Sequence, residues 1–177
     1  MANRVFIATS LDGFISDRDG ALDWLHSVPN PDNLDFGYTA FMEQIDAIVM
    51  GRKTFETVCG FDCDWPYTKP VFVLSKSLTS LPEGYEGKAE LIAGSLGNVI
   101  ATLHQKKRHE LYIDGGATIQ SFLKDDLIDE MIITALPILL GGGARLFGEL
   151  PDSLKFEHVQ TEVLLNSMVQ NRYRRRR

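Results

Sequence analysis

Short runs of apolar residues recur along the chain, and segments with helical spacing separate several of them. Continuous apolar runs of about four to eight residues are typical of strands that are covered on both faces of a sheet. The segments that predict strands are residues 5–8, 47–50, 71–74, 91–93, 111–113 and part of 127–136. The last part of the chain predicts a hairpin, with strands at 156–165 and 168–173 around Asn166–Ser167.

Apolar positions with a period near 3.6 predict helices between these strands. One such stripe consists of Leu34, Tyr38, Phe41, Met42 and Ile45. Shorter helices are predicted at residues 53–58, after a cap at Ser95, and from Gly116 to near Leu123. Because strands alternate with helices, we predict a three-layer α/β fold. Its sheet is mixed and mostly parallel, with helices on both faces and a C-terminal antiparallel hairpin.

The length and composition predict one domain over residues 1–177. Hydrophobic residues make up 44% and charged residues 24% of the sequence, which is typical of a globular protein. No stretch approaches the roughly 18 apolar residues of a membrane span, and Met1–Arg4 has no signal-peptide character. We therefore expect a cytoplasmic protein without a membrane partner. Cys59 and Cys63, the two cysteines, are expected to be reduced thiols.

The net charge of −6 is unevenly distributed. Five arginines, Arg172 and Arg174 to Arg177, leave 13 basic against 24 acidic residues in the rest of the chain. An acidic body argues against a broad nucleic-acid surface. The terminal arginines are expected to form a frayed, solvated end.

Three glycine-bearing or hydroxyl-bearing turns follow predicted strands. They are Met50–Thr54, Val73–Ser77 and Ile113–Thr118. Ligands of parallel sheets bind outside the carboxyl ends of the strands, and backbone N–H groups at a helix N-terminus attract anions. The turns therefore predict phosphate binding, although each is also compatible with an ordinary strand-to-helix connection.

Several other site types are not supported. The chain has no Gly-x-Gly-x-x-Gly fingerprint and no Walker loop. Its histidines, His26, His104, His109 and His158, are scattered without metal-ligand spacing, so we expect no metal site. The His-x-Glu and Pro-Cys-x-x-Cys segments of a zinc deaminase are also absent.

Taken together, the turns and the N-terminal segment resemble the dihydrofolate-reductase-fold superfamily. The chain is most similar to the branch that contains the C-terminal reductase domain of the riboflavin-biosynthesis deaminase-reductase, RibD, and its stand-alone relatives. The matching segments are Ser10–Ile15, Asp19–Trp24, Val49–Thr54, Val73–Ser75, Ile113–Ile119 and Leu136–Gly143. They span nearly the whole chain in the family order.

This resemblance implies NADPH as the cofactor and a homodimer formed through the edge of the C-terminal strands. It places phosphate and ribose contacts on Gly51, Arg52, Lys53, Thr54, Leu74, Ser75 and Lys76. It places nicotinamide and pyrophosphate contacts on Ala8, Ile15, Gly115, Gly116, Ala117, Thr118 and Ile119, with Gly94 and Ser95 beside the adenine. Trp24 lies where the family has an aromatic residue near the cofactor loop, although a core position is equally compatible with it.

Two carboxylates are candidates for the substrate chemistry. Asp35 lies fifteen residues before Met50, which matches the offset of the acidic residue that binds the pterin in dihydrofolate reductases. The alternative for Asp35 is a helix cap. Asp12 lies beside the expected substrate loop, and its alternative is a turn residue before Gly13.

The resemblance leaves several substrates open. One is a phosphoribosylamino-pyrimidine of riboflavin biosynthesis, and the second is a pterin such as dihydrofolate. The segment from Pro29 to Asp35 has no lysine or arginine to bind a substrate phosphate. A stand-alone reductase with another small substrate is the third possibility. A non-catalytic nucleotide-binding module is the alternative from a different class.

Overall fold

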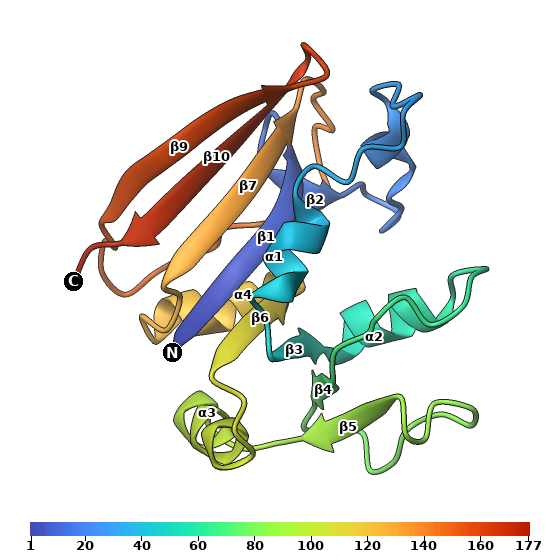
Figure 1. Ribbon diagram of the computed structural model, residues 1–177, viewed down its shortest axis with the longest axis vertical. Coiled ribbons are helices and arrows are strands. Elements are labelled where there is room, and N and C mark those ends of the chain that lie inside the picture. The colour runs from blue at the N-terminus through green and yellow to red at the C-terminus, as the bar shows by residue number, and fades with distance from the viewer.

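The computed structural model describes residues 1–177 and contains one large sheet (Figure 1). Its eight strands lie in the order β5-β4-β3-β6-β1-β7-β10-β9. The bounds are β1 Ala2–Ser10, β3 Ala47–Gly51, β4 Val71–Leu74, β5 Ala89–Ile92, β6 Glu110–Asp114, β7 Glu130–Leu136, β9 Phe156–Leu164 and β10 Met168–Arg175. A second, two-stranded sheet pairs β2 (Phe14–Ser16) with β8 (Ala144–Arg145).

The predicted fold class is confirmed. Strands β5 through β7 pair in parallel, whereas β10 pairs antiparallel with both β7 and β9. The helices are α1 Tyr38–Glu43, α2 Arg52–Cys59, α3 Leu96–Gln105 and α4 Gly116–Lys124, with a 3-10 helix, η1, at Asp23–His26. No helix is both long enough and apolar enough to cross a membrane.

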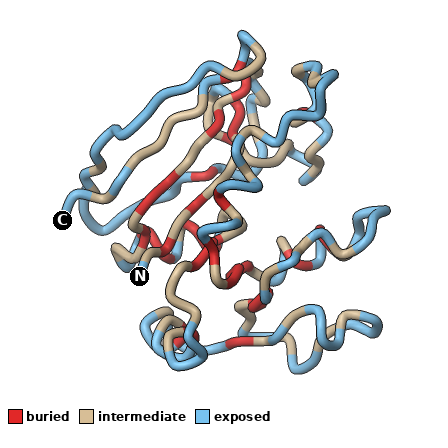
Figure 2. Tube along the Cα trace, in the orientation of Figure 1, coloured by how far each residue is buried: buried red, intermediate tan, exposed pale blue.

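Two apolar clusters cover the two faces of the central strands. The buried residues accordingly gather along these strands (Figure 2). Alternation of side chains along a strand sends Val49 to one cluster and Ile48 and Met50 to the other. The first cluster also contains Val99 of α3 and Phe122 of α4. The second contains residues of α1 and α2. The central strands are thus buried on both faces, as their continuous apolar runs predict, whereas β9 at the end of the sheet is mostly exposed.

Helix α1 is shorter than the apolar stripe predicts. The backbone has positive φ at Phe36 (55°) and Gly37 (86°), which stops the helix from starting before Tyr38. Leu34, the first residue of the predicted stripe, is exposed. By contrast, Ser95 caps α3 as predicted, because its Oγ accepts a hydrogen bond from Asn98 N at 3.3 Å.

The prediction of a frayed C-terminal end is wrong. Arg175 Nε lies 2.6 Å from Asp126 Oδ1, and Arg177 Nη1 lies 2.6 Å from Asp129 Oδ1. Arg172 pairs with the buried carboxylate of Glu130 at 2.8 Å. The loop between α4 and β7 is acidic, and two of its carboxylates, Asp126 and Asp129, bind Arg175 and Arg177.

Candidate functional site

The three predicted turns lie side by side at one edge of the sheet. Strand β3 is paired with β4 and with β6, and the register aligns Gly51 with Leu74 and Met50 with Asp114. Helices α2 and α4 start directly after β3 and β6. Because the carboxyl ends of these parallel strands meet at the same edge, the turns line two adjoining cavities.

The glycines allow the first and third turns to pack closely. A Cβ at Gly51 would lie 2.7 Å from Thr118 Oγ1, and a Cβ at Gly115 would overlap the side chain of Thr54. Gly115 also has a positive φ of 92°. A Cβ at Gly116 would lie 2.5 Å from Ile15 Cδ1. The positive φ and the Thr54 contact therefore favour glycine at position 115, whereas a side chain at Gly51 or Gly116 would have to displace Thr118 or Ile15.

The smaller cavity, of about 600 Å³, lies between the starts of α2, α3 and α4. Four cations, on Arg52, Lys53, Lys76 and Lys124, line it against one carboxylate, Asp125. The other predicted residues along its wall are Gly51, Thr54, Leu74, Ser75, Gly94, Ser95, Gly115, Ala117 and Thr118. The cavity thus combines positive charge with N–H groups at helix starts, an arrangement that favours anions.

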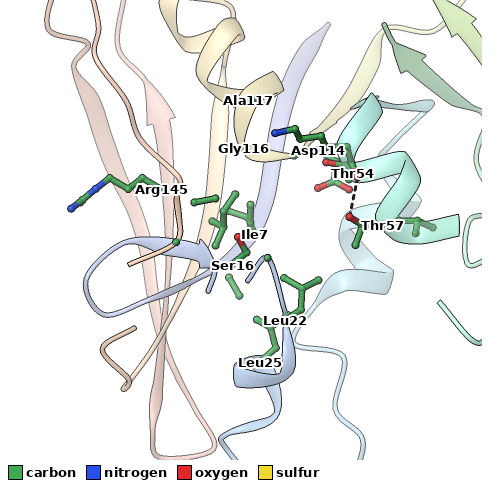
Figure 3. A pocket seen from close by; sticks show the side chains of 18 of the residues that line it. Ile7, Ser16, Leu22, Leu25, Thr54, Thr57, Asp114, Gly116, Ala117 and Arg145 are labelled. Atoms are coloured by element: carbon green, nitrogen blue, oxygen red, sulfur yellow. Dashed lines mark hydrogen bonds between the residues drawn. The ribbon is translucent and has the colours of Figure 1, made fainter. Parts of the chain in front are cut away.

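The larger cavity has a volume of about 980 Å³ and lies beside η1, between the β2–β8 sheet and α2 (Figure 3). Ala8 and Ile15 line it, together with Leu22 and Leu25 of the η1 segment. The two cavities share Lys53, Thr54, Gly115 and Ala117. In Figure 3, Thr54 and Asp114 lie on one side of the cavity and Arg145 on the opposite side, with its guanidinium pointing away from the centre.

Asp114 is the carboxyl group of the larger cavity with the most perturbed pKa. Burial raises the pKa of Asp114 to about 6, against the opposing effect of the nearby Gly115 N–H and Tyr112 hydroxyl, both of which favour the carboxylate. Tyr67 and Tyr112 line the same cavity, and burial raises their pKa values as well. A carboxyl group that is partly protonated near neutral pH can give a proton to a substrate.

Asp114 is not among the functional residues predicted from the sequence, although it directly precedes the Gly115–Gly116 pair. Its position at the carboxyl end of a buried strand was the available indication. Tyr67 and Phe61 were also missed. They reach the larger cavity from the irregular segment between α2 and β4, and no local pattern predicts where such a segment lies.

The structure does not bring Asp35 to either cavity. The Asp35 side chain is exposed, and its two carboxylate oxygens accept hydrogen bonds from Gly37 N at 3.0 Å and Thr39 N at 2.9 Å. Hydrogen bonds from Thr39, and from the Gly37 N–H, lower the pKa of Asp35. The alternative of a cap at the start of α1 therefore describes this residue.

Asp12 also lies outside both cavities. Its carboxylate accepts hydrogen bonds from Ser10 Oγ at 2.6 Å, Leu140 N at 3.1 Å and Gly141 N at 2.8 Å. These bonds, led by that of the Ser10 hydroxyl, lower the pKa of Asp12 to about 2. Asp12 is thus a fixed anion that connects two loops rather than a proton donor.

Two predicted cofactor contacts belong to the core instead. Trp24 is buried against Leu136 and Met168 and lines neither cavity. Ile119 faces inward from α4 and is fully buried in the first apolar cluster. A helix presents only part of its surface to a site, so the N-terminal residues of α4 reach the cavities and Ile119 does not.

No three His, Cys, Asp or Glu side chains lie together in an arrangement that could hold a metal ion. The first N–H groups of α4 have no acceptor within the helix, and they border the region that the two cavities share. The arrangement can therefore hold an elongated, phosphate-bearing ligand whose apolar end lies near Asp114.

Comparison with known proteins gives consistent results. The protein YwjB of Bacillus subtilis (strain 168), which is uncharacterized, is 36% identical over 154 residues and covers 85% of each chain. A crystal structure from Shewanella sp. PV-4, provisionally named a riboflavin biosynthesis protein, is 62% identical over the whole of both chains, with a TM-score of 0.98. Dihydrofolate reductase from Enterococcus faecalis, complexed with NADP(H), shares the fold with a TM-score of 0.68 at 17% identity, covering 98% of this chain and 96% of its own.

The bifunctional deaminase and 5-amino-6-(5-phosphoribosylamino)uracil reductase of Thermotoga maritima has a TM-score of 0.73 at 17% identity. That match covers 98% of this chain and 56% of the bifunctional enzyme, so it shows a shared fold over part of the larger protein. The model of the RibD C-terminal domain matches residues 4–170. The chain therefore belongs to the RibD C-terminal domain family, whose fold it shares with reductases of the riboflavin-pathway type.

Proposed function

We propose that the protein is an NADPH-dependent reductase of a small heterocyclic substrate. The observation that carries this proposal is the pair of adjoining cavities, one cationic and one largely apolar, that meet at the starts of α2 and α4. An extended dinucleotide with a charged middle and an apolar ring at one end matches this division. NADPH supplies a hydride when it is bound, and the protein must orient the ring and exclude water.

The cationic cavity fits the adenosine half of the cofactor. Arg52, Lys76 and the hydroxyl of Ser75 line it and could contact a 2′-phosphate, while Gly94 and Ser95 would border the adenine. Arg52 already lies 3.6 Å from Glu56 in an exposed ion pair, and such a pair is weak enough to be exchanged for a phosphate. This charge distribution favours NADPH over NADH.

The junction of the two cavities fits the pyrophosphate. Lys53 and Thr54 border it from α2, and Gly115 and Ala117 border it from α4. Beyond this junction, Ala8 and Ile15 offer an apolar wall on which the nicotinamide could lie. Asp114 would then be close to the substrate, and we assign it the role of proton donor in place of Asp35 and Asp12.

For the substrate, we propose an amino-pyrimidine most similar to 5-amino-6-(5-phosphoribosylamino)uracil, with a pterin as the second candidate. Membership of the RibD C-terminal family supports the first. The absence of Asp35 from the cavity counts against the family's mode of pterin binding. A carboxyl group and the phenol of Tyr67 in one cavity suit a ring that both donates and accepts hydrogen bonds.

The test begins with binding of the coenzyme. We expect purified protein to bind NADPH with micromolar affinity, measured by the fluorescence of the coenzyme, and to bind NADH more weakly. Oxidation followed at 340 nm with each candidate substrate then distinguishes the two substrates. Binding without turnover of any pyrimidine or pterin would favour the nucleotide-binding module, and no binding at tens of micromolar would exclude the reductase.

A further inference from the structure

Two chain segments together form the wall of the larger cavity opposite α2. They are residues 10–18, which contain β2, and residues 137–146, which contain β8. Seven of their residues line the cavity: Ile15, Ser16, Asp17, Arg18, Gly143, Ala144 and Arg145. Strand β8 has two residues and β2 has three. Pairing over so short a length is weak, so other contacts must determine where the wall stands.

Asp12 provides one of these contacts from outside the cavity. Its carboxylate accepts the backbone N–H groups of Leu140 and Gly141, one on each oxygen, at 3.1 and 2.8 Å. The Ser10 hydroxyl donates to the same carboxylate at 2.6 Å and fixes its orientation. Ser10 is itself buried and accepts a hydrogen bond from Phe14 N at 2.9 Å. A chain of hydrogen bonds therefore runs from the end of β1, through Asp12, to residues 140–143, which we call the glycine loop.

Arg18 fixes the glycine loop from its other side. Its Nη2 donates to the carbonyl oxygen of Gly141 at 2.8 Å. A Cβ at Gly142 would overlap the Arg18 side chain, and a Cβ at Gly143 would overlap the backbone of Ser16 and Asp17. The loop is thus held between Asp12 and Arg18, and at Gly143, where a Cβ would meet backbone atoms and φ is positive, the close approach requires glycine.

The wall packs against the start of α4. A Cβ at Gly116 would lie 2.5 Å from Ile15 Cδ1 and 3.5 Å from the Arg145 carbonyl oxygen. Gln120 of α4 also donates to that carbonyl oxygen at 2.8 Å. A shift of the glycine loop would therefore move Ile15 and Arg145 relative to the part of the cavity where the proposed function places the nicotinamide.

We propose that Asp12 is a positioning residue that holds the β2–β8 wall against the nicotinamide end of the cavity, through its hydrogen bonds to Leu140 and Gly141. The inference rests on the proposed function, because it assumes that a nicotinamide lies there. It predicts that loss of the carboxylate loosens the ring end of bound NADPH. The adenosine half occupies the other cavity, which Asp12 does not approach.

The test compares wild-type protein with Asp12→Asn and with Asp19→Asn. The Asp19 side chain is exposed, makes no hydrogen bond or ion pair, and lies in the same part of the chain, so it is a matched control. The asparagine at position 12 keeps one acceptor oxygen and replaces the other with a donor, so one N–H of the glycine loop loses its partner.

Two measurements are made on each protein. Hydrogen exchange without ligand should be at least tenfold faster at Leu140 and Gly141 in Asp12→Asn, and unchanged in Asp19→Asn. With NADPH as the probe, the fluorescence lifetime of the bound nicotinamide should fall toward that of free NADPH. The dissociation constant should change by less than about threefold, because the adenosine contacts remain. If the variant were only less stable overall, the lifetime and the dissociation constant would change together.

The outcomes separate the inference from the function on which it rests. If wild-type protein does not bind NADPH, the proposed function is overturned and the inference falls with it. If wild-type protein binds and Asp12→Asn keeps the wild-type lifetime, the inference alone is overturned. If Asp12→Asn does not fold, Ser10→Ala removes the hydroxyl that orients the Asp12 carboxylate at a residue that lines neither cavity, and the same two changes are expected.

Discussion

Thr118 Oγ1 lies 2.7 Å from the position that a Cβ would occupy at Gly51. Gly51 ends β3, whereas Thr118 lies in the first turn of α4, after β6 and 67 positions further along the chain. Their contact brings the starts of α2 and α4 together, and the two cavities join at that place. The architecture of the site thus depends on packing between turns as much as on the residues that would contact a ligand.

Gly51→Ala should destabilise the protein by about 1–3 kcal/mol, because the methyl group overpacks against Thr118. Urea unfolding measures this change. Gly97→Ala is the control, since nothing lies within 4 Å of a Cβ at this position of α3, and alanine should stabilise that helix. Adding Thr118→Ala to Gly51→Ala should restore part of the lost stability. An additive double variant would contradict the contact.

Gly116→Val should abolish NADPH binding while the protein stays folded. The branched side chain would displace Ile15 from the wall of the larger cavity, directly beside the Gly115 and Ala117 positions that both cavities share. Fluorescence titration with NADPH measures the affinity, and circular dichroism checks the fold. Unchanged affinity would remove the turn after β6 from the proposed site.

Arg52→Ala should reduce the preference for NADPH over NADH, because it removes a cation from the smaller cavity. We expect the affinity for NADPH to fall about tenfold, as for a charge-assisted hydrogen bond worth ~1.5 kcal/mol, and that for NADH to change little. Lys88→Ala, which removes an exposed cation outside both cavities, is the control. An equal loss for both coenzymes would mean that Arg52 does not contact the 2′-phosphate.

Asp114→Asn should lower turnover far more than coenzyme affinity. As a proton donor, Asp114 must be protonated, so the rate it supports should be high at low pH and fall as the pH rises through about 6. The pH profile of kcat measures this effect. A variant that retains both the rate and the descending limb would exclude Asp114 as the donor.

Protonation of Asp114 should also affect the stability of the folded protein. Its pKa in the folded protein lies above the ordinary value of 3.8, so the folded state binds this proton more tightly than the unfolded chain. The contribution of protonated Asp114 to the free energy of unfolding is therefore present in full below pH 3.8, and it is lost as the pH rises through about 6. Asp114→Asn should remove this part of the pH dependence, which thermal unfolding across pH 4 to 7 measures.

Arg175→Ala should lower the melting temperature, whereas Arg174→Ala should not. The Arg175 guanidinium makes two hydrogen bonds to Asp126 and one to the carbonyl of Lys155, but Arg174 is exposed and unpaired. The pKa of Asp126 is lowered by this contact, so the stabilisation should be present above pH 3.8 and decline as the pH falls further. Equal melting temperatures for the two variants would contradict the pairing.

The homodimer remains a prediction from the family resemblance. Val163 of β9 and Val169 of β10 are paired across the C-terminal hairpin and are both exposed. Val163→Lys should shift a dimer toward monomer in sedimentation analysis, because a charge cannot be buried at an apolar contact without cost. An unchanged sedimentation coefficient would place any dimer contact elsewhere.

The sequence by itself determined the sheet, its covering helices and the positions of the binding turns. Continuous apolar runs such as 47–50 and 71–74 are typical of strands that are buried on both faces, and the local pattern predicted these strands. The cap at Ser95 and the helix start after Gly115–Gly116 were likewise local properties. The family resemblance then supplied an ordered set of contacts around these turns.

Only the tertiary structure decided what the carboxylates do. Asp35, Asp12 and Asp114 all lie near turns in the sequence, yet the first caps α1, the second connects two loops and the third lines the larger cavity. The pairing of the C-terminal arginines with the loop before β7 could not be predicted from the sequence either. Burial and hydrogen-bond partners set the state of an ionisable group, and both are supplied by residues far away in the chain, so they exist only once the sheet has assembled.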